Sequence, residues 1–176
     1  MGVALEIIPE CFVDTTLVSA LLGGIGVNHQ KSCNNVVAKM RGKFGDGFAV
    51  GIIDNDKRRP GYLDEFTCVA SSAHIRLLKH PQKNHFIVVL SPACEGFVLS
   101  VVQQAGLSME DYNLPGELDN LKKITKSIVS SKDARLVELF KDLRLCGECA
   151  ILKNVLWYLL EKRYKATEKD LAALFN

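Results

Sequence analysis

The sequence lacks the features that mark several large classes of protein. Its 22 Lys and Arg residues are nearly balanced by 20 Asp and Glu residues, which argues against a chain coated in cations for gripping duplex DNA, although a local basic face is still allowed. No apolar run approaches the roughly 20 residues of a membrane span. Hydrophobic residues make up 48% of the 176 residues, unlike a disordered chain. The composition predicts one globular protein that does not enter a membrane.

Several sequence signatures are also missing. The N-terminus has no basic and apolar signal-peptide regions, and the six cysteines sit largely in apolar stretches, so we expect reduced thiols in a cytoplasmic protein. Cys146 and Cys149 form a C-x-x-C pair, but no second pair completes a zinc site, which favours structural thiols. The glycines at 23–26 follow an expected helix rather than a strand. They therefore fail the context of a phosphate loop, and a small-molecule enzyme with a nucleotide fingerprint is disfavoured.

Hydrophobic periodicity predicts an α/β fold with a mostly parallel central sheet, helices on both faces and a helical C-terminal region. The runs at 47–53 and 86–90 are continuously apolar, as in strands buried on both faces. Ser131 and Thr167 are expected to cap helices, the latter with Asp170. Expected strands are 3–8, 47–53, 66–70, 74–78 and 86–90, and expected helices are 13–22, 30–44, 95–104, 118–129, 133–143, 147–164 and 168–175.

A polar stretch at 108–116, which contains Pro and Gly, marks the expected seam between two regions. We predict an α/β domain over 1–107 and a helical extension over 108–176 packed on the same core. The last long helix carries a wide apolar stripe around Trp157, typical of a helix buried on more than one side. The C-terminal helices could alternatively contact a protein partner or a second copy of the chain.

Acidic residues follow the ends of expected strands. Glu10, Asp54, Asp56 and Glu95 all lie just past such ends, where ligands gather in open α/β sheets. Asp54 and Asp56 are two residues apart, so on an extended segment they point to the same side. Two close carboxylates repel unless a cation or a proton lies between them, and Mg²⁺ favours such oxygen ligands. The alternative is an ordinary turn, in which Asp bonds its own backbone.

Basic residues near these acids are candidates for contacts with phosphate. His29 and Lys31 lie at the N-terminal end of the expected helix 30–44, where backbone amides favour anions. Lys57 and Arg58 directly follow the acidic pair and could draw in a phosphate backbone. A polar loop and a solvated basic turn are the alternatives.

Two short segments carry a family resemblance. Residues 9–14 open a helix after the first expected strand, and residues 52–56 end a later buried strand. The chain resembles, over about residues 3–105, the Toprim (topoisomerase–primase) domain, and more narrowly its bacterial branch near the OLD-family nucleases. In that family a Glu follows the first strand, often with a second acid four positions later, and D-x-D closes a later strand. The matching residues here are Glu10, Asp14, Asp54, Asp56 and, in a Pro-x-x-Glu segment, Glu95.

The resemblance implies a Toprim-like fold and a nuclease that uses one or two Mg²⁺ or Mn²⁺ ions on nucleic-acid phosphodiester bonds, in a bacterial defence or repair setting. Glu10, Asp54 and Asp56 would be catalytic metal ligands, Asp14 and Glu95 further acidic ligands, and Lys57 an assisting cation. The chain has Cys11 where the family usually has Gly, and a Cβ there crowds the approach of a phosphate or metal. This departure favours the alternative, a non-catalytic Toprim-like binding or regulatory module.

Overall fold

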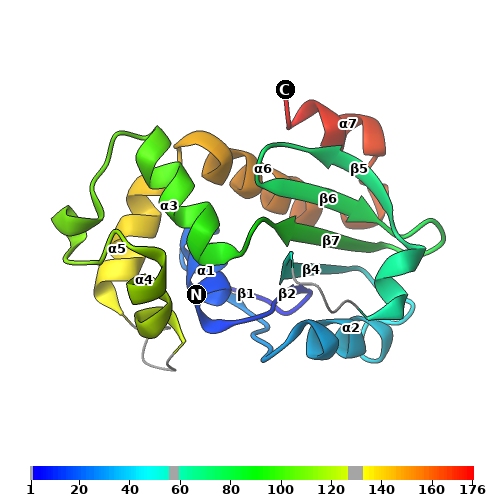
Figure 1. Cartoon of the computed structure of the whole chain (residues 1–176). Coiled ribbons are helices and arrows are strands. Elements are labelled where there is room, and N and C mark those ends of the chain that lie inside the picture. The colour runs from blue at the N-terminus through cyan, green and yellow to red at the C-terminus, as the bar shows by residue number, and fades with distance from the viewer. Residues whose placement is uncertain (1, 56–59, 127–132) are drawn as a thin grey trace.

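A computed structural model describes residues 2–55, 60–126 and 133–176 (Figure 1). The predicted site residues Asp56, Lys57 and Arg58, and the predicted cap Ser131, therefore lie outside the described residues. The strands are β1 Val3–Ala4, β2 Ile7–Pro9, β3 Gly26–Val27, β4 Ala49–Asp54, β5 Thr67–Ser71, β6 Ile75–Lys79 and β7 His85–Leu90. The α-helices are α1 Phe12–Leu21, α2 Cys33–Arg41, α3 Cys94–Gln104, α4 Leu118–Thr125, α5 Ala134–Leu143, α6 Gly147–Lys162 and α7 Glu168–Ala173, with short 3₁₀ turns η1 Gly61–Glu65, η2 Met109–Tyr112 and η4 Arg163–Lys165.

The five-stranded sheet has the order β2-β4-β7-β6-β5, which confirms the α/β class. Strands β2, β4 and β7 are parallel, whereas β6 is antiparallel to β7 and β5 is antiparallel to β6. The prediction of a mostly parallel sheet is wrong, because the sheet is mixed. Only residues 80–84 connect β6 to β7, and a parallel crossover needs a dozen or more residues.

The first predicted strand, 3–8, divides into two short strands. Strand β1 pairs in parallel with β3 in a separate two-stranded ribbon, and β2 joins the main sheet beside β4. A turn at residues 5–6 separates them. The chain therefore joins the main sheet only at Ile7, and Pro9, at the end of β2, pairs in register with Ile52. This register brings the residue after β2 to the end of β4.

Helices cover both faces of the sheet, as the sequence predicts. Helix α2 packs on one face, against Ile53 and Ile87, and the larger apolar cluster on the other face includes residues of α1, α3, α5 and α6 (Figure 1). All residues of β7 are buried, as are the first five of β4, which confirms that both continuous apolar runs are strands covered on two sides.

The C-terminal helices share this larger apolar cluster. The carboxylate of Glu148, at the start of α6, accepts a hydrogen bond of 3.2 Å from the backbone N–H of His74 and forms a second of 2.7 Å with the His74 Nδ1. The His74 Nε2 lies 3.2 Å from Ser100 Oγ of α3. These bonds join two helices to the start of β6. The predicted cap of α7 is confirmed, because the Thr167 side chain accepts from the Asp170 N–H.

The structure also describes the state of the cysteines and the lengths of the apolar helices. All six cysteines have free thiols. Among the described residues, no helix is both long and apolar enough to cross a membrane. Trp157 of α6 is 40% exposed, so its ring is only partly covered by the core.

Candidate functional site

Glu10 and Asp54 meet where two parallel strands end. The backbone N–H of Glu10 donates to Ile52 O at 3.0 Å, which continues the β2–β4 ladder by one residue. The carboxylate of Glu10 then accepts a hydrogen bond from the backbone N–H of Asp54, at 3.2 Å. Asp54 is the last residue of β4, and its Oδ1 accepts from the backbone N–H of Cys94 at 2.9 Å, at the start of α3. Both side chains are thus held by backbone donors of neighbouring elements.

Asp14 lies beneath this pair in the first turn of α1. It is completely buried, and its Oδ2 accepts from the backbone N–H of Cys11 at 3.1 Å, which makes it the acidic partner in the capping box of the helix. Among the described residues, no N–H or O–H group donates to its other oxygen, Oδ1. The thiols of Cys11 and Cys94, which are weak donors, lie close enough to the carboxyl to lower its pKa. Asp14 therefore sits behind the cavity wall rather than on it.

The neighbouring carboxyl groups change the pKa values of Asp14 and Asp54. Burial raises the pKa of Asp14 well above its ordinary value, and the nearby Glu10 carboxylate raises it further. Burial, followed by repulsion from Asp14, raises the pKa of Asp54 to about 8. Near neutral pH the cluster therefore holds a proton, or it accepts a cation that takes the proton's place.

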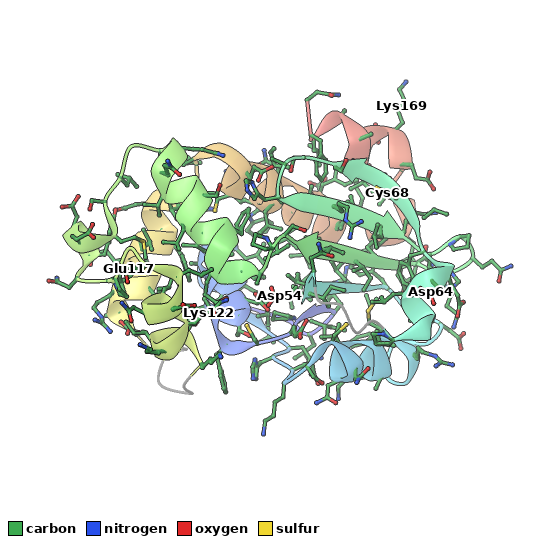
Figure 2. The ribbon with its side chains drawn as sticks, in the orientation of Figure 1. Asp54, Asp64, Cys68, Glu117, Lys122 and Lys169 are labelled. Carbon is green, nitrogen blue, oxygen red and sulfur yellow. The ribbon has the colours of Figure 1, made fainter. Side chains whose placement is uncertain are left out.

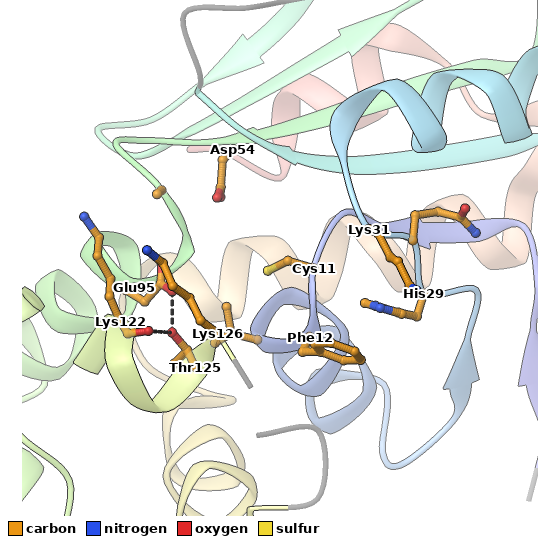
Figure 3. Close-up of a pocket in the computed structure, with 12 residues that line it drawn as sticks. Cys11, Phe12, His29, Lys31, Asp54, Glu95, Lys122, Thr125 and Lys126 are labelled. Atoms are coloured by element: carbon orange, nitrogen blue, oxygen red, sulfur yellow. Dashed lines mark hydrogen bonds between the residues drawn. The ribbon is translucent and has the colours of Figure 1, made fainter. Parts of the chain in front are cut away.

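A cavity of about 650 Å³ opens beside Asp54, between the ends of the strands and α4 (Figure 3). Lys122 and Lys126 extend from α4 toward the space beneath Asp54 in this view. The lining combines one carboxylate from the sheet with several amines and an apolar floor. The lining residues are Cys11, Phe12, Val13, His29, Gln30, Lys31, Asp54, Ala93, Glu95, Lys122, Thr125 and Lys126.

Glu95 lines the cavity, but it also has a structural role. It is only 8% exposed, and its Oε1 accepts a hydrogen bond of 2.5 Å from Thr125 Oγ of α4. This bond ties α4 to the first turn of α3. Glu95 therefore positions α4, which carries Lys122 and ends next to Lys126. This structural role is separate from the predicted role of Glu95 as a ligand.

His29 lines the same cavity in a fixed orientation. Its ring stacks on Phe12, with centroids 4.2 Å apart, and its Nδ1 lies 2.9 Å from Thr15 Oγ. The single hydroxyl proton of Thr15 already goes to Cys11 O, so the Nδ1 of His29 must be the donor in this pair. Burial lowers the pKa of His29. The neutral ring thus leaves Nε2 as an acceptor, which suits a donor or a metal better than a phosphate.

A complete metal cage is not present in the described part of the chain. Among residues 2–55, 60–126 and 133–176, no group of three or more His, Cys, Asp or Glu side chains is arranged to hold a metal ion. Mg²⁺, however, usually takes only one or two carboxylates and completes its shell with water and phosphate oxygens. Glu10 and Asp54 fit that smaller requirement, and Asp56 follows two residues after Asp54.

The contribution of α4 was not predicted from the sequence. Lys122 and Lys126 are four residues apart, so they lie on one face of the helical turn, and this spacing was visible in the sequence. That this face meets the end of the sheet depends on the contact between Thr125 and Glu95, which has no local signal. Cys94 was also missed, because its role is played by the backbone N–H.

Comparisons of the chain with models of protein families, with curated proteins and with solved structures found no match. Function must therefore be inferred from the geometry and chemistry of the site itself.

Proposed function

We propose that this chain is a Mg²⁺-dependent, Toprim-like protein that acts on phosphodiester bonds of nucleic acid. The observation that carries the proposal is the Glu10–Asp54 pair at the ends of adjacent parallel strands, beside a cavity rimmed by lysines. Ligands of open α/β sheets bind at this edge. The mixed sheet of three parallel strands with an added hairpin is compatible with a Toprim-like fold.

Glu10 and Asp54 would hold the metal, and Asp56, two residues later in the sequence, is proposed as a further ligand. The raised pKa of Asp54 supports this role, because a carboxylate in a repulsive cluster gains most from a neighbouring cation. Once bound, Mg²⁺ or Mn²⁺ supplies a Lewis acid that polarises a phosphate and activates water. The chain's own residues orient the two carboxylates through the Asp54 and Cys94 backbone N–H groups.

The lysines supply the complementary half of the site. Lys122 and Lys126 reach the cavity from α4 and its C-cap, and Lys31 reaches it from the loop before α2. The three lysines can therefore contact phosphates on either side of a bound diester. Their positive charges also offset the negative charge that a phosphodiester brings to an acidic cluster. The shape of the site, with acids at the strand ends and amines on the opposite wall, therefore favours a phosphate ester over an uncharged substrate.

The direct test is cleavage of end-labelled single-stranded and duplex oligonucleotides in Mg²⁺ or Mn²⁺. We expect the wild type to cleave at least one substrate, Asp54→Asn to lose cleavage, and Asp64→Asn to retain it. Asp64 is an exposed carboxylate in η1, far from Asp54 in Figure 2. If Asp54→Asn cleaves as well as the wild type, the catalytic assignment is wrong.

The contribution of α4 can be tested within one helix. Lys122→Gln removes a cavity-lining cation, whereas Lys123→Gln removes an exposed one whose amine bonds Asn120. We expect Lys122→Gln to weaken oligonucleotide binding by about three- to tenfold at low salt, because one phosphate contact is lost. Fluorescence anisotropy measures this change. Equal effects of the two substitutions would show that α4 does not form the binding wall.

One observation favours the second candidate, a non-catalytic Toprim-like binding or regulatory module. Cys11 stands where the family usually has Gly, its side chain lines the cavity, and burial raises the pKa of its thiol, so the group is a neutral obstruction. Cys11→Gly distinguishes the candidates. If the wild type binds oligonucleotide without cleaving it and Cys11→Gly gains cleavage, the native chain is a module that has lost turnover.

A further inference from the structure

A second cavity, of about 830 Å³, lies between α1, the glycine-containing turn that follows it, and α5. Ser19 contributes to its wall from α1, and Gly23 and Gly24 contribute backbone with positive φ, where an added Cβ would meet no atom within 4 Å. Lys141 and Arg144 contribute two cationic side chains from the end of α5. None of the lining residues is acidic.

Among the described residues, the two cations of this cavity have no acidic partner. Neither side chain forms a hydrogen bond or ion pair with any residue in the described ranges. Lys141 and Arg144 are three residues apart, so they lie on the same face where α5 ends. The C-terminal end of a helix carries only about half an elementary negative charge. That partial charge cannot balance two full positive charges.

The guanidinium of Arg144 has a buried donor that points to a ligand. A guanidinium remains charged at every physiological pH, yet its Nε is buried and, among the described residues, has no hydrogen-bond acceptor. A buried donor without an acceptor carries the full penalty of its lost hydration. An acceptor that enters the cavity would remove this penalty, and an anionic acceptor would also balance the charge.

We propose that this second cavity binds a phosphate group, either free or carried by a larger molecule. A phosphate dianion matches the two cations in charge, and its oxygens match the forked donors of Arg144. The Ser19 hydroxyl lies in the same wall and adds a donor. The cavity exceeds the volume of phosphate alone, so a nucleotide-sized molecule or one unit of a nucleic-acid backbone also fits. The site uses none of the residues assigned above to metal binding.

The Nε–H signal of Arg144 in a ¹H–¹⁵N NMR spectrum reports on this site directly. The signal is assigned as the one absent from Arg144→Gln, and the wild type is titrated with inorganic phosphate in EDTA, so that no metal-dependent binding contributes. We expect a saturable shift of this signal. Lys141→Gln should weaken the apparent affinity by about tenfold, as expected for a charge-assisted contact in a partly buried site. Lys169→Gln, in α7 at the far edge of Figure 2, should not change it.

A second titration with a short single-stranded oligonucleotide identifies the source of the phosphate. If the oligonucleotide moves the Arg144 signal and competes with inorganic phosphate, the site holds a nucleic-acid backbone; if only inorganic phosphate moves it, the site holds a free or small-molecule phosphate. Both results support phosphate binding. The proposal is overturned if neither probe moves the signal, or if Lys141→Gln binds phosphate as tightly as the wild type. If Arg144→Gln does not fold, through-bond side-chain correlations in the wild-type spectrum assign the same signal, so the titration does not depend on that variant.

Discussion

Replacing Asp54 by Asn should stabilise the protein near neutral pH while it removes the proposed function. Asn has nearly the same shape, and its amide oxygen can still accept from the Cys94 N–H. Its amide nitrogen can donate toward the neighbouring carboxylates, which now repel Asp54. The substitution therefore removes the repulsion between buried carboxylates without opening a cavity. Gains of stability at the expense of activity are common at functional sites.

The size of this effect follows from the protonation of Asp54. Burial and the Asp14 carboxylate raise the pKa of Asp54 to about 8. An unfolded Asp has a pKa of about 3.9, so at pH 7 the folded protein would lose up to about 4 kcal/mol of stability at this site, at about 1.36 kcal/mol per unit. Water in the adjacent cavity screens part of that charge. We therefore expect Asp54→Asn to raise the free energy of unfolding by about 1–2 kcal/mol at pH 7.

The pH dependence gives the sharper test. Because the pKa values of Asp14 and Asp54 are raised by folding, the folded state binds more protons than the unfolded state between about pH 4 and pH 8. The stability of the wild type should therefore fall as pH rises through this window. Asp54→Asn should show a shallower fall, and the two proteins should converge near pH 4. Urea unfolding in EDTA at pH 4, 5, 6, 7 and 8 measures all three features.

The control is Asp64→Asn, which removes an exposed carboxylate of the same type. It should follow the wild-type curve in parallel. An equal difference in stability between Asp54→Asn and the wild type at pH 4 and pH 8 would contradict this prediction, and so would a lower stability of Asp54→Asn at pH 8. Either result would mean that the Asp54 carboxylate is not strained in the folded protein.

Substitutions of Glu148 and of two glycines test the packing that supports the site. Glu148→Ala leaves the backbone N–H and Nδ1 of His74 without their acceptor and should lower the free energy of unfolding by about 2–3 kcal/mol in urea titrations, whereas Glu148→Gln should cost less. Gly51→Ala places a Cβ 2.7 Å from Ile87 Cδ1 under α2 and should lower the melting temperature, at a cost of about 1–3 kcal/mol. Gly26→Ala, whose nearest neighbour is 3.9 Å away, should be close to neutral, and equal effects of the two Gly substitutions would contradict the packing described.

The sequence predicts the buried strands well because their signal is local. Strands β4 and β7 fall within two residues of the expected runs, since continuous hydrophobicity directly reflects cover on both faces. The direction of a strand relative to its neighbours has no such local signal in the sequence. The antiparallel β5–β6–β7 arrangement was missed because periodicity identifies strands but not their partners, although the five-residue connection between β6 and β7 excluded a crossover.

The site was predictable to the same limited extent. The meeting of Glu10 with Asp54 follows from strand order, because both end parallel neighbours. The full burial of Asp14 does not follow from its motif, which fits an exposed ligand as well as a helix cap. The wall formed by Lys122 depends on a tertiary hydrogen bond between α3 and α4. Such contacts between distant segments leave no periodic trace in a single sequence.

The most direct test of the central claim is Mn²⁺ binding, followed by electron paramagnetic resonance, to the wild type and to Asp54→Asn at pH 7.5. Each protein is titrated alone and with a short oligonucleotide, whose phosphates can complete the coordination shell, and Asp64→Asn serves as the control. We predict that the wild type and Asp64→Asn bind Mn²⁺ and that the oligonucleotide tightens this binding. Asp54→Asn should not bind Mn²⁺, whether or not the oligonucleotide is present. Equal binding by Asp54→Asn and the wild type, or no binding by the wild type even with the oligonucleotide, would contradict a metal site at the ends of β2 and β4.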